Sequence, residues 1–146
     1  MSIFDQDQRK DYMGVLARAR PDRLAALLPD LPDHTWLRAP EIGTTMVRGR
    51  VGASGAPFNL GEMTVTRCTL QLADGAVGHA YVQGRDKGHA TRAALIDALI
   101  QSGQQPEVTT PLLTTLRTEE TERRRIRDAK AAATKVEFFT MVRGED

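Results

Sequence analysis

The apolar residues near the start of the chain recur with the spacing of one helical face. They are Tyr12, Val15, Leu16 and Ala19. This spacing predicts a helix from about Asp7 to Arg18. A second, short helix is expected at Pro21–Leu28, because proline suits the first turn of a helix, where its missing N–H is not needed. The chain therefore opens with a pair of helices.

In the middle of the chain the apolar period changes to the alternation that is typical of strands. The predicted strands are Thr45–Val51, Met63–Leu72 and Val77–Gln83. A loop at Gly52–Pro57 joins the first two, and Asp74-Gly75, a strong hairpin signal, joins the last two. Short connections favour antiparallel pairing. We therefore expect a three-stranded antiparallel meander.

Helical periodicity returns after the third strand. Asp86 is suited to cap a helix that runs to about Gln101, and Gly103 is suited to end it. After a loop at Gln104–Pro111, another helix is expected from about Leu112 to Ala133. The whole pattern predicts one α+β domain, in which helices pack on the antiparallel sheet.

The segment Val136–Val142 is apolar and rich in residues that favour strands. Phe138 and Phe139 would point to opposite faces of a strand, so that both faces would need cover. Such a strand either pairs with the chain's own sheet or docks on another chain. Because termini usually fray unless they are held, we expect an assembly element here, including contacts between copies of this chain.

The positive and negative charges of the chain nearly cancel. Its 146 residues, a single domain over 1–146, contain 20 Lys and Arg against 19 Asp and Glu, a formal net charge of +1. This balance gives no bulk attraction to nucleic acid, and Arg123-Arg124-Arg125 lies among acidic residues, as on a salt-bridged face. No apolar run approaches the roughly 20 residues of a membrane span, and the start is polar, unlike a signal peptide. With one cysteine, which excludes an internal disulfide, we expect a cytoplasmic protein without nucleic-acid or membrane partners.

The histidines and the cysteine show no metal-binding or catalytic spacing. The three histidines are far apart in the sequence, and no CxxC or HExxH motif is present. Cys68 shares a predicted strand face with Leu70 and Leu72, so a buried structural thiol is expected. The sequence therefore predicts no catalytic residue and no metal site in this chain.

A candidate ligand site lies where the third strand leads into the next helix. Its residues are Gln83, Arg85, Lys87, His89 and Arg92. Free N–H groups and the helix dipole attract anions to a helix start, and these side chains add positive charge. They predict substrate binding through a phosphate or triphosphate group. The alternative is a solvated first turn, in which Asp86 caps the helix and pairs with Arg85 or Arg92.

Four separated blocks of the sequence follow one another in a distinctive order. They are Gly61–Cys68, Asp74–Lys87 with His89-Ala90, Ala94–Leu99 and Phe138–Gly144. In this order they resemble the PhnG family of the phosphonate carbon–phosphorus lyase pathway, and the resemblance spans nearly the whole chain. One departure is Thr91, where an acidic residue is expected in some relatives, which weakens any carboxylate role at this position.

The resemblance implies a subunit of a core complex with PhnH, PhnI and PhnJ. In that complex PhnI uses ATP to displace a nucleobase by a phosphonate, giving a ribose 1-phosphonate 5-triphosphate. After pyrophosphate is removed, PhnJ cleaves the carbon–phosphorus bond with an iron–sulfur cluster and S-adenosylmethionine. With a single cysteine, this chain is not the radical subunit. It is expected to bind no cofactor itself and to support assembly and the positioning of an anionic substrate, with the chemistry in its partners.

Two other functions remain open from the sequence. The chain could be a stand-alone phosphate- or nucleotide-binding enzyme that uses Arg85, Lys87 and His89, with the histidine as acid or base. It could also be a structural subunit without ligand contact. Binding of ATP or a ribose triphosphate by the purified chain would distinguish these alternatives.

Overall fold

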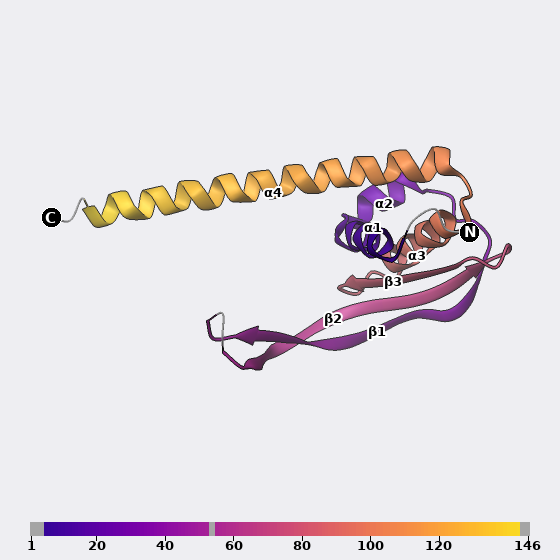
Figure 1. Ribbon diagram of the computed structural model, residues 1–146, viewed down its shortest axis with the longest axis horizontal. Helices are drawn as coiled ribbons and strands as arrows, with labels where there is room; N and C mark the ends of the chain where they lie inside the picture. The colour runs from indigo at the N-terminus through magenta and orange to yellow at the C-terminus, as the bar shows by residue number, and fades with distance from the viewer. Residues whose placement is uncertain (1–4, 53–54, 144–146) are drawn as a thin grey trace.

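The computed structural model describes residues 5–52 and 55–143, with side chains described up to residue 135 (Figure 1). The elements in chain order are α1 (Gln6–Arg18), α2 (Pro21–Leu27), β1 (His34–Arg50), β2 (Pro57–Leu72), β3 (Val77–Gln83), α3 (Lys87–Ser102) and α4 (Pro106–Arg143). The helices lie on one side of a single sheet (Figure 1). The predicted α+β class and the opening pair of helices are confirmed.

The sheet is a three-stranded antiparallel meander, as predicted, with the order β1-β2-β3. The turn between β2 and β3 uses the predicted Asp74-Gly75 pair, in which Gly75 takes a positive φ of 92° and the Asp74 side chain accepts the N–H of Ala76. β3 pairs only with Val65–Gln71 of β2. The outer part of the β1–β2 pair is therefore a two-stranded ribbon.

The boundaries of the first helices follow from local signals. Asp5 and Gln8 form a capping box at the start of α1, in which each side chain accepts the other residue's backbone N–H. α2 begins at Pro21, as predicted. Both helices bury one apolar side, with Tyr12, Leu16 and Leu24 no more than 1% exposed.

The core lies between α3 and the inner face of the sheet. Cys68 and Leu70 are 2% and 0% exposed on that face, which confirms the predicted burial of the thiol. α3 packs so closely that a Cβ atom at Gly78 would lie 1.9 Å from the carbonyl oxygen of Ala94. Only glycine permits this approach of strand to helix. The helix is capped by Asp86 and ends at Gly103, as predicted.

Two strands are longer than the sequence pattern predicts. β1 begins at His34 rather than Thr45, and β2 at Pro57 rather than Met63. Register shifts interrupt β1 on both sides of Arg38, and a third shift, opposite Val47 and Arg48, inserts Leu60 into β2. Each shift changes which face the next side chains occupy, so the alternation that marks a strand is lost from the sequence. Residues 53 and 54 of the predicted loop lie outside the described residues.

The last helix corrects two predictions. The predicted loop at Gln104–Pro111 is mostly helical, because α4 begins at Pro106 and contains Pro111 near its start. The predicted strand at Val136–Val142 is wrong, since α4 continues to Arg143. A helix that is already formed gains one hydrogen bond for each residue it adds, and the alanine-rich segment before residue 136 is well suited to carry it onward.

Two arms project from the helical body. α4 and the β1–β2 ribbon both extend beyond α1, α2 and α3 in the same direction (Figure 1). α4 contacts the body through its first turns, where Leu112, Leu113 and Leu116 are buried, whereas residues 124–135 are exposed. The distal half of each arm is therefore unsupported within the described chain.

Candidate functional site

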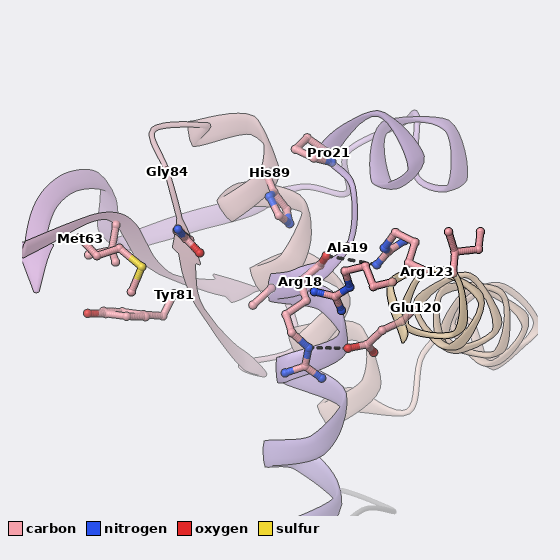
Figure 2. A pocket seen from close by; sticks show the side chains of 14 residues that line it. Arg18, Ala19, Pro21, Met63, Tyr81, Gly84, His89, Glu120 and Arg123 are labelled. Atoms are coloured by element: carbon pink, nitrogen blue, oxygen red, sulfur yellow. Dashed lines mark hydrogen bonds and ion pairs between the residues drawn. The ribbon is translucent and has the colours of Figure 1, made fainter. Parts of the chain in front are cut away.

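An open cleft of about 990 Å³ lies where the middle of α4 passes the end of α1 and the sheet (Figure 2). Its lining comes from every helix and from two strands: Ala17, Arg18, Ala19, Pro21, Met63, Val65, Tyr81, Gln83, Gly84, His89, Glu120, Arg123, Ile126 and Arg127. Only the tertiary structure brings these segments together. We refer to this feature as the cleft.

One wall of the cleft is apolar. Met63 lies beside the ring of Tyr81 (Figure 2), and Val65 lies on the same face of the sheet. Tyr81 is 52% exposed, and Ile126 on α4 is 41% exposed. The cleft therefore offers water-facing apolar surface on both sides.

The other wall is charged and joins α1 to α4. The Nε of Arg18 donates to Glu120 at 2.6 Å, and Arg124 donates to the same carboxylate at 3.1 Å. The Arg18 hydrogen bond holds the pKa of Glu120 below its ordinary value, against the opposing effect of burial. Arg123 donates to the carbonyl of Arg18 at 3.4 Å, and Arg127 makes no ion pair with the described residues. Since Glu120 is already matched, the cleft carries an excess of positive charge.

His89 lies at the inner end of the cleft. It is 5% exposed, and its Nε2 is 2.9 Å from the carbonyl oxygen of Leu16. A carbonyl only accepts, so Nε2 carries the proton and donates. The contact fixes the start of α3 against α1. His89 is thus committed to a structural hydrogen bond as well as facing the cleft.

The structure separates the residues of the predicted anion site. Gln83 and His89 line the cleft, whereas Arg85 and Lys87 are exposed and do not. The Nε of Arg92 donates to the carbonyl of Leu28 at 3.1 Å, which ties the end of α2 to α3. Asp86 accepts the N–H of His89 at 2.9 Å and makes no ion pair with Arg85 or Arg92 among the described residues. Its carboxylate therefore occupies one of the N–H groups that an anion would use.

The comparisons with known proteins agree with the resemblance in the sequence. The family model described as phosphonate metabolism protein PhnG matches residues 7–144. A protein of Rhizobium meliloti (strain 1021), named alpha-D-ribose 1-methylphosphonate 5-triphosphate synthase subunit PhnG, is 44% identical over 144 residues, which cover 95% of this chain and 91% of that protein. The chain belongs to the PhnG family.

Among the described residues of this PhnG-family chain, the most buried carboxylate lies outside the cleft. Asp97 is 0% exposed and accepts from Arg9 at 2.9 Å, from the Tyr12 hydroxyl at 2.6 Å and from the backbone N–H of His79 at 2.9 Å. The hydrogen bond to Asp97 raises the pKa of Arg9, and burial raises the pKa of Tyr12. Every partner is satisfied, so the group joins α1 and α3 to the free edge of β3. An aspartate inside the apolar run Ala93–Ile100 is the signal that could have predicted it.

The Cys68 thiol is buried and makes a hydrogen bond inside the fold. Burial raises the pKa of Cys68 to about 11, and its Sγ donates to the carbonyl of Ala90 at 3.4 Å. It is therefore a protonated, packed side chain at neutral pH. Within residues 5–52 and 55–143, no group of three His, Cys, Asp or Glu side chains is placed to hold a metal ion, and no helix is long and apolar enough to span a membrane.

Proposed function

We propose that this chain is a non-autonomous subunit of an alpha-D-ribose 1-methylphosphonate 5-triphosphate synthase. This is the synthase of which its relative is named a subunit. In this role it supports phosphonate catabolism by assembling with other subunits. The observation that carries the proposal is the pair of unsupported arms. A two-stranded ribbon and the far end of a 38-residue helix gain little stability alone in water, so a partner that covers them is expected.

The proposed partners are subunits of the PhnH, PhnI and PhnJ types, together with contacts between copies of this chain. The C-terminal part of α4 is one proposed contact. ATP, S-adenosylmethionine and an iron–sulfur cluster are proposed to act in the partner subunits. The chain itself is proposed to contribute surface to the complex.

Co-purification tests the subunit role. The tagged chain is expressed with the other synthase subunits of its own organism, and the retained proteins are identified by mass. The partners should be retained in fixed ratio, and the pure chain alone should show neither nucleosidase nor carbon–phosphorus lyase turnover. Retention of no partner, or turnover by the pure chain, would contradict the proposal.

We also propose that Arg85 and Lys87 help to position the anionic substrate at the exposed start of α3. Both side chains are exposed and make no ion pair among the described residues. Arg85→Ala and Lys87→Ala should each lower turnover per assembled complex by about tenfold, as for the loss of a charge-assisted hydrogen bond. Gln83, His89 and Arg92 are the other residues of the predicted site, and their substitutions are compared with those of Arg85 and Lys87. His89 and Arg92 also make hydrogen bonds that hold the fold. If assembly and turnover fall together, Arg85 and Lys87 contact a partner instead.

A further inference from the structure

A continuous row of apolar side chains leads out of the cleft along the ribbon. It consists of Tyr81, Val65, Met63, Val47, Leu60 and Phe58, which we call the apolar stripe. The pairing register puts them on one face: Gln83 pairs with Val65, Thr45 with Met63 and Gly49 with Phe58. Leu60 covers the bare backbone of Gly49, where a Cβ would lie 2.8 Å from its Cδ1. The stripe is thus built by the register rather than by sequence neighbours.

Most of the stripe faces water. Tyr81, Leu60 and Phe58 are 52%, 63% and 43% exposed, and only Val65 is fully buried. No third strand or helix of the described chain covers the ribbon beyond the end of β3. Contiguous exposed apolar surface of this kind marks an interaction site. From Met63 to Phe58 the stripe runs about 16 Å along β2, and its apolar, elongated form suits a polypeptide segment.

The charges of the cleft indicate the chemistry of that segment. Arg123 and Arg127 line the same cleft as Tyr81, Met63 and Val65 at the stripe's inner end, and Glu120 is already matched by Arg18 and Arg124. Lys130, one turn further along α4, also makes no ion pair with the described residues. The occupant therefore needs carboxylates on the side that faces α4 and apolar side chains on the side that faces the sheet.

We propose that the cleft and the apolar stripe together seat a segment of another synthase subunit, which runs from the cleft beside α4 along the stripe face of the β1–β2 ribbon. Its apolar side chains pack on Tyr81, Met63 and Leu60, and its carboxylates pair with Arg123 and Arg127. This inference rests on the proposed function and specifies which face of this subunit takes the partner. The cleft and the adjoining stripe face act as one docking groove.

Matched variants of the ribbon test the apolar side. Leu60→Ser alters the stripe, whereas Met46→Ser alters the opposite face of the same ribbon, where Met46 pairs with Glu62 and is 48% exposed. Affinity for the co-expressed subunits is measured by titration, and thermal melting of each free variant checks folding. Leu60→Ser should weaken binding by about tenfold or more and Met46→Ser by less than about twofold. Equal losses, or none for Leu60→Ser, would overturn the inference.

Charge reversal tests the α4 side. Arg127→Glu reverses a charge that has no ion-pair partner among the described residues, whereas Arg125→Glu changes a nearby arginine that is paired with Glu122 and does not line the cleft. Arg127→Glu should weaken assembly by about tenfold, with the loss reduced in high salt, and Arg125→Glu should have a small effect. Equal effects of the two reversals would refute an acidic occupant.

A photo-reactive phenylalanine analogue at position 81 identifies the occupant directly. In the assembled complex it should cross-link to a partner polypeptide, whereas the analogue at Asp30, an exposed residue outside the cleft, should not. Capture of no polypeptide, with ATP bound in the cleft of the free chain, would replace the docking groove by a small-ligand site. If the wild-type chain retains no partner at all, the proposed function fails; if it does and the stripe variants bind normally, only this inference fails.

Discussion

At the scale of single residues, the packing of α3 depends on two tightly enclosed positions, Gly78 and Asp97. Gly78 meets the carbonyl of Ala94 so closely that any side chain forces the strand and the helix apart. Asp97 is buried without exposure and is held by three donors from α1 and β3. Both positions act through the body of the molecule and lie away from the cleft.

Gly78→Ala is expected to lower the free energy of unfolding by about 3 kcal/mol, because the added methyl group overpacks the sheet against α3. Gly43→Ala is the matched control, since nothing lies within 4 Å of a Cβ at that strand position. Its effect should stay within about 0.5 kcal/mol. Urea unfolding measures both, and equal effects would show that the approach at Gly78 is not tight.

Asp97→Ala is expected to lower the free energy of unfolding by about 3–5 kcal/mol, because it leaves the Tyr12 hydroxyl and the Arg9 guanidinium without their acceptor. Asp11→Ala provides the comparison. Asp11 also forms an ion pair, with Arg117 at 2.6 Å, but both side chains are about half exposed. Its loss should cost less than about 1 kcal/mol. A small loss at Asp97 in urea unfolding would mean that its network adds little.

At the scale of elements, α4 is joined to the first helices by ion pairs as well as by leucines. Glu120 binds Arg18 of α1, and Glu119 binds Arg23 of α2. The depressed pKa of Glu120 shows that the native state prefers its ionised form. Its contribution to stability is therefore complete well above the ordinary value of 4.5 and is lost as the pH falls below that value.

Glu120→Gln tests this sign. Near neutral pH the variant should unfold more easily than the wild type by about 1 kcal/mol, a modest value because Arg18 is half exposed and solvated. The difference should close as acid protonates Glu120 in the wild type. Urea unfolding of both proteins across this pH range provides the measurement. A difference that persists or grows in acid would exclude the ion pair as its source.

At the scale of the whole molecule, the part that stabilises the fold differs from the part that is proposed to bind a partner. The buried leucines of α4 lie at Leu112, Leu113 and Leu116, near its start. The distal half of the same helix and the β1–β2 ribbon extend past the body (Figure 1). Contacts that hold the fold are thus separate from surfaces that are open to a partner.

Deletion of residues 136–146 should leave the melting of the free chain almost unchanged but weaken its retention by the synthase subunits by about tenfold or more. The reason is that the buried side chains described in α4 lie before the deletion, whereas its far end projects from the body. Thermal melting and co-purification measure the two effects separately. Normal assembly of the shortened chain would exclude this end of α4 from the interface.

Much of the fold can be predicted from local sequence signals. The caps at Asp5, Asp86 and Gly103, and the turn at Asp74-Gly75, act within a few residues and mark where α1, α3 and β3 begin or end. The early part of β1 cannot be predicted in this way, because its register shifts break the alternation of apolar and polar residues. The helical end of α4 is missed because β-branched and aromatic residues favour strands only when a sheet receives them.

The sequence by itself determined the fold class, the burial of Cys68 and the family, because periodicity, capping and ordered motif blocks are written along the chain. The tertiary structure alone decided the cleft and the apolar stripe. Arg18, Tyr81 and Arg127 are distant in sequence and meet only after α4 folds back over α1. The predicted anion site divided for the same reason: burial turned His89 and Arg92 toward α1 and α2, while Arg85 and Lys87 stayed in water.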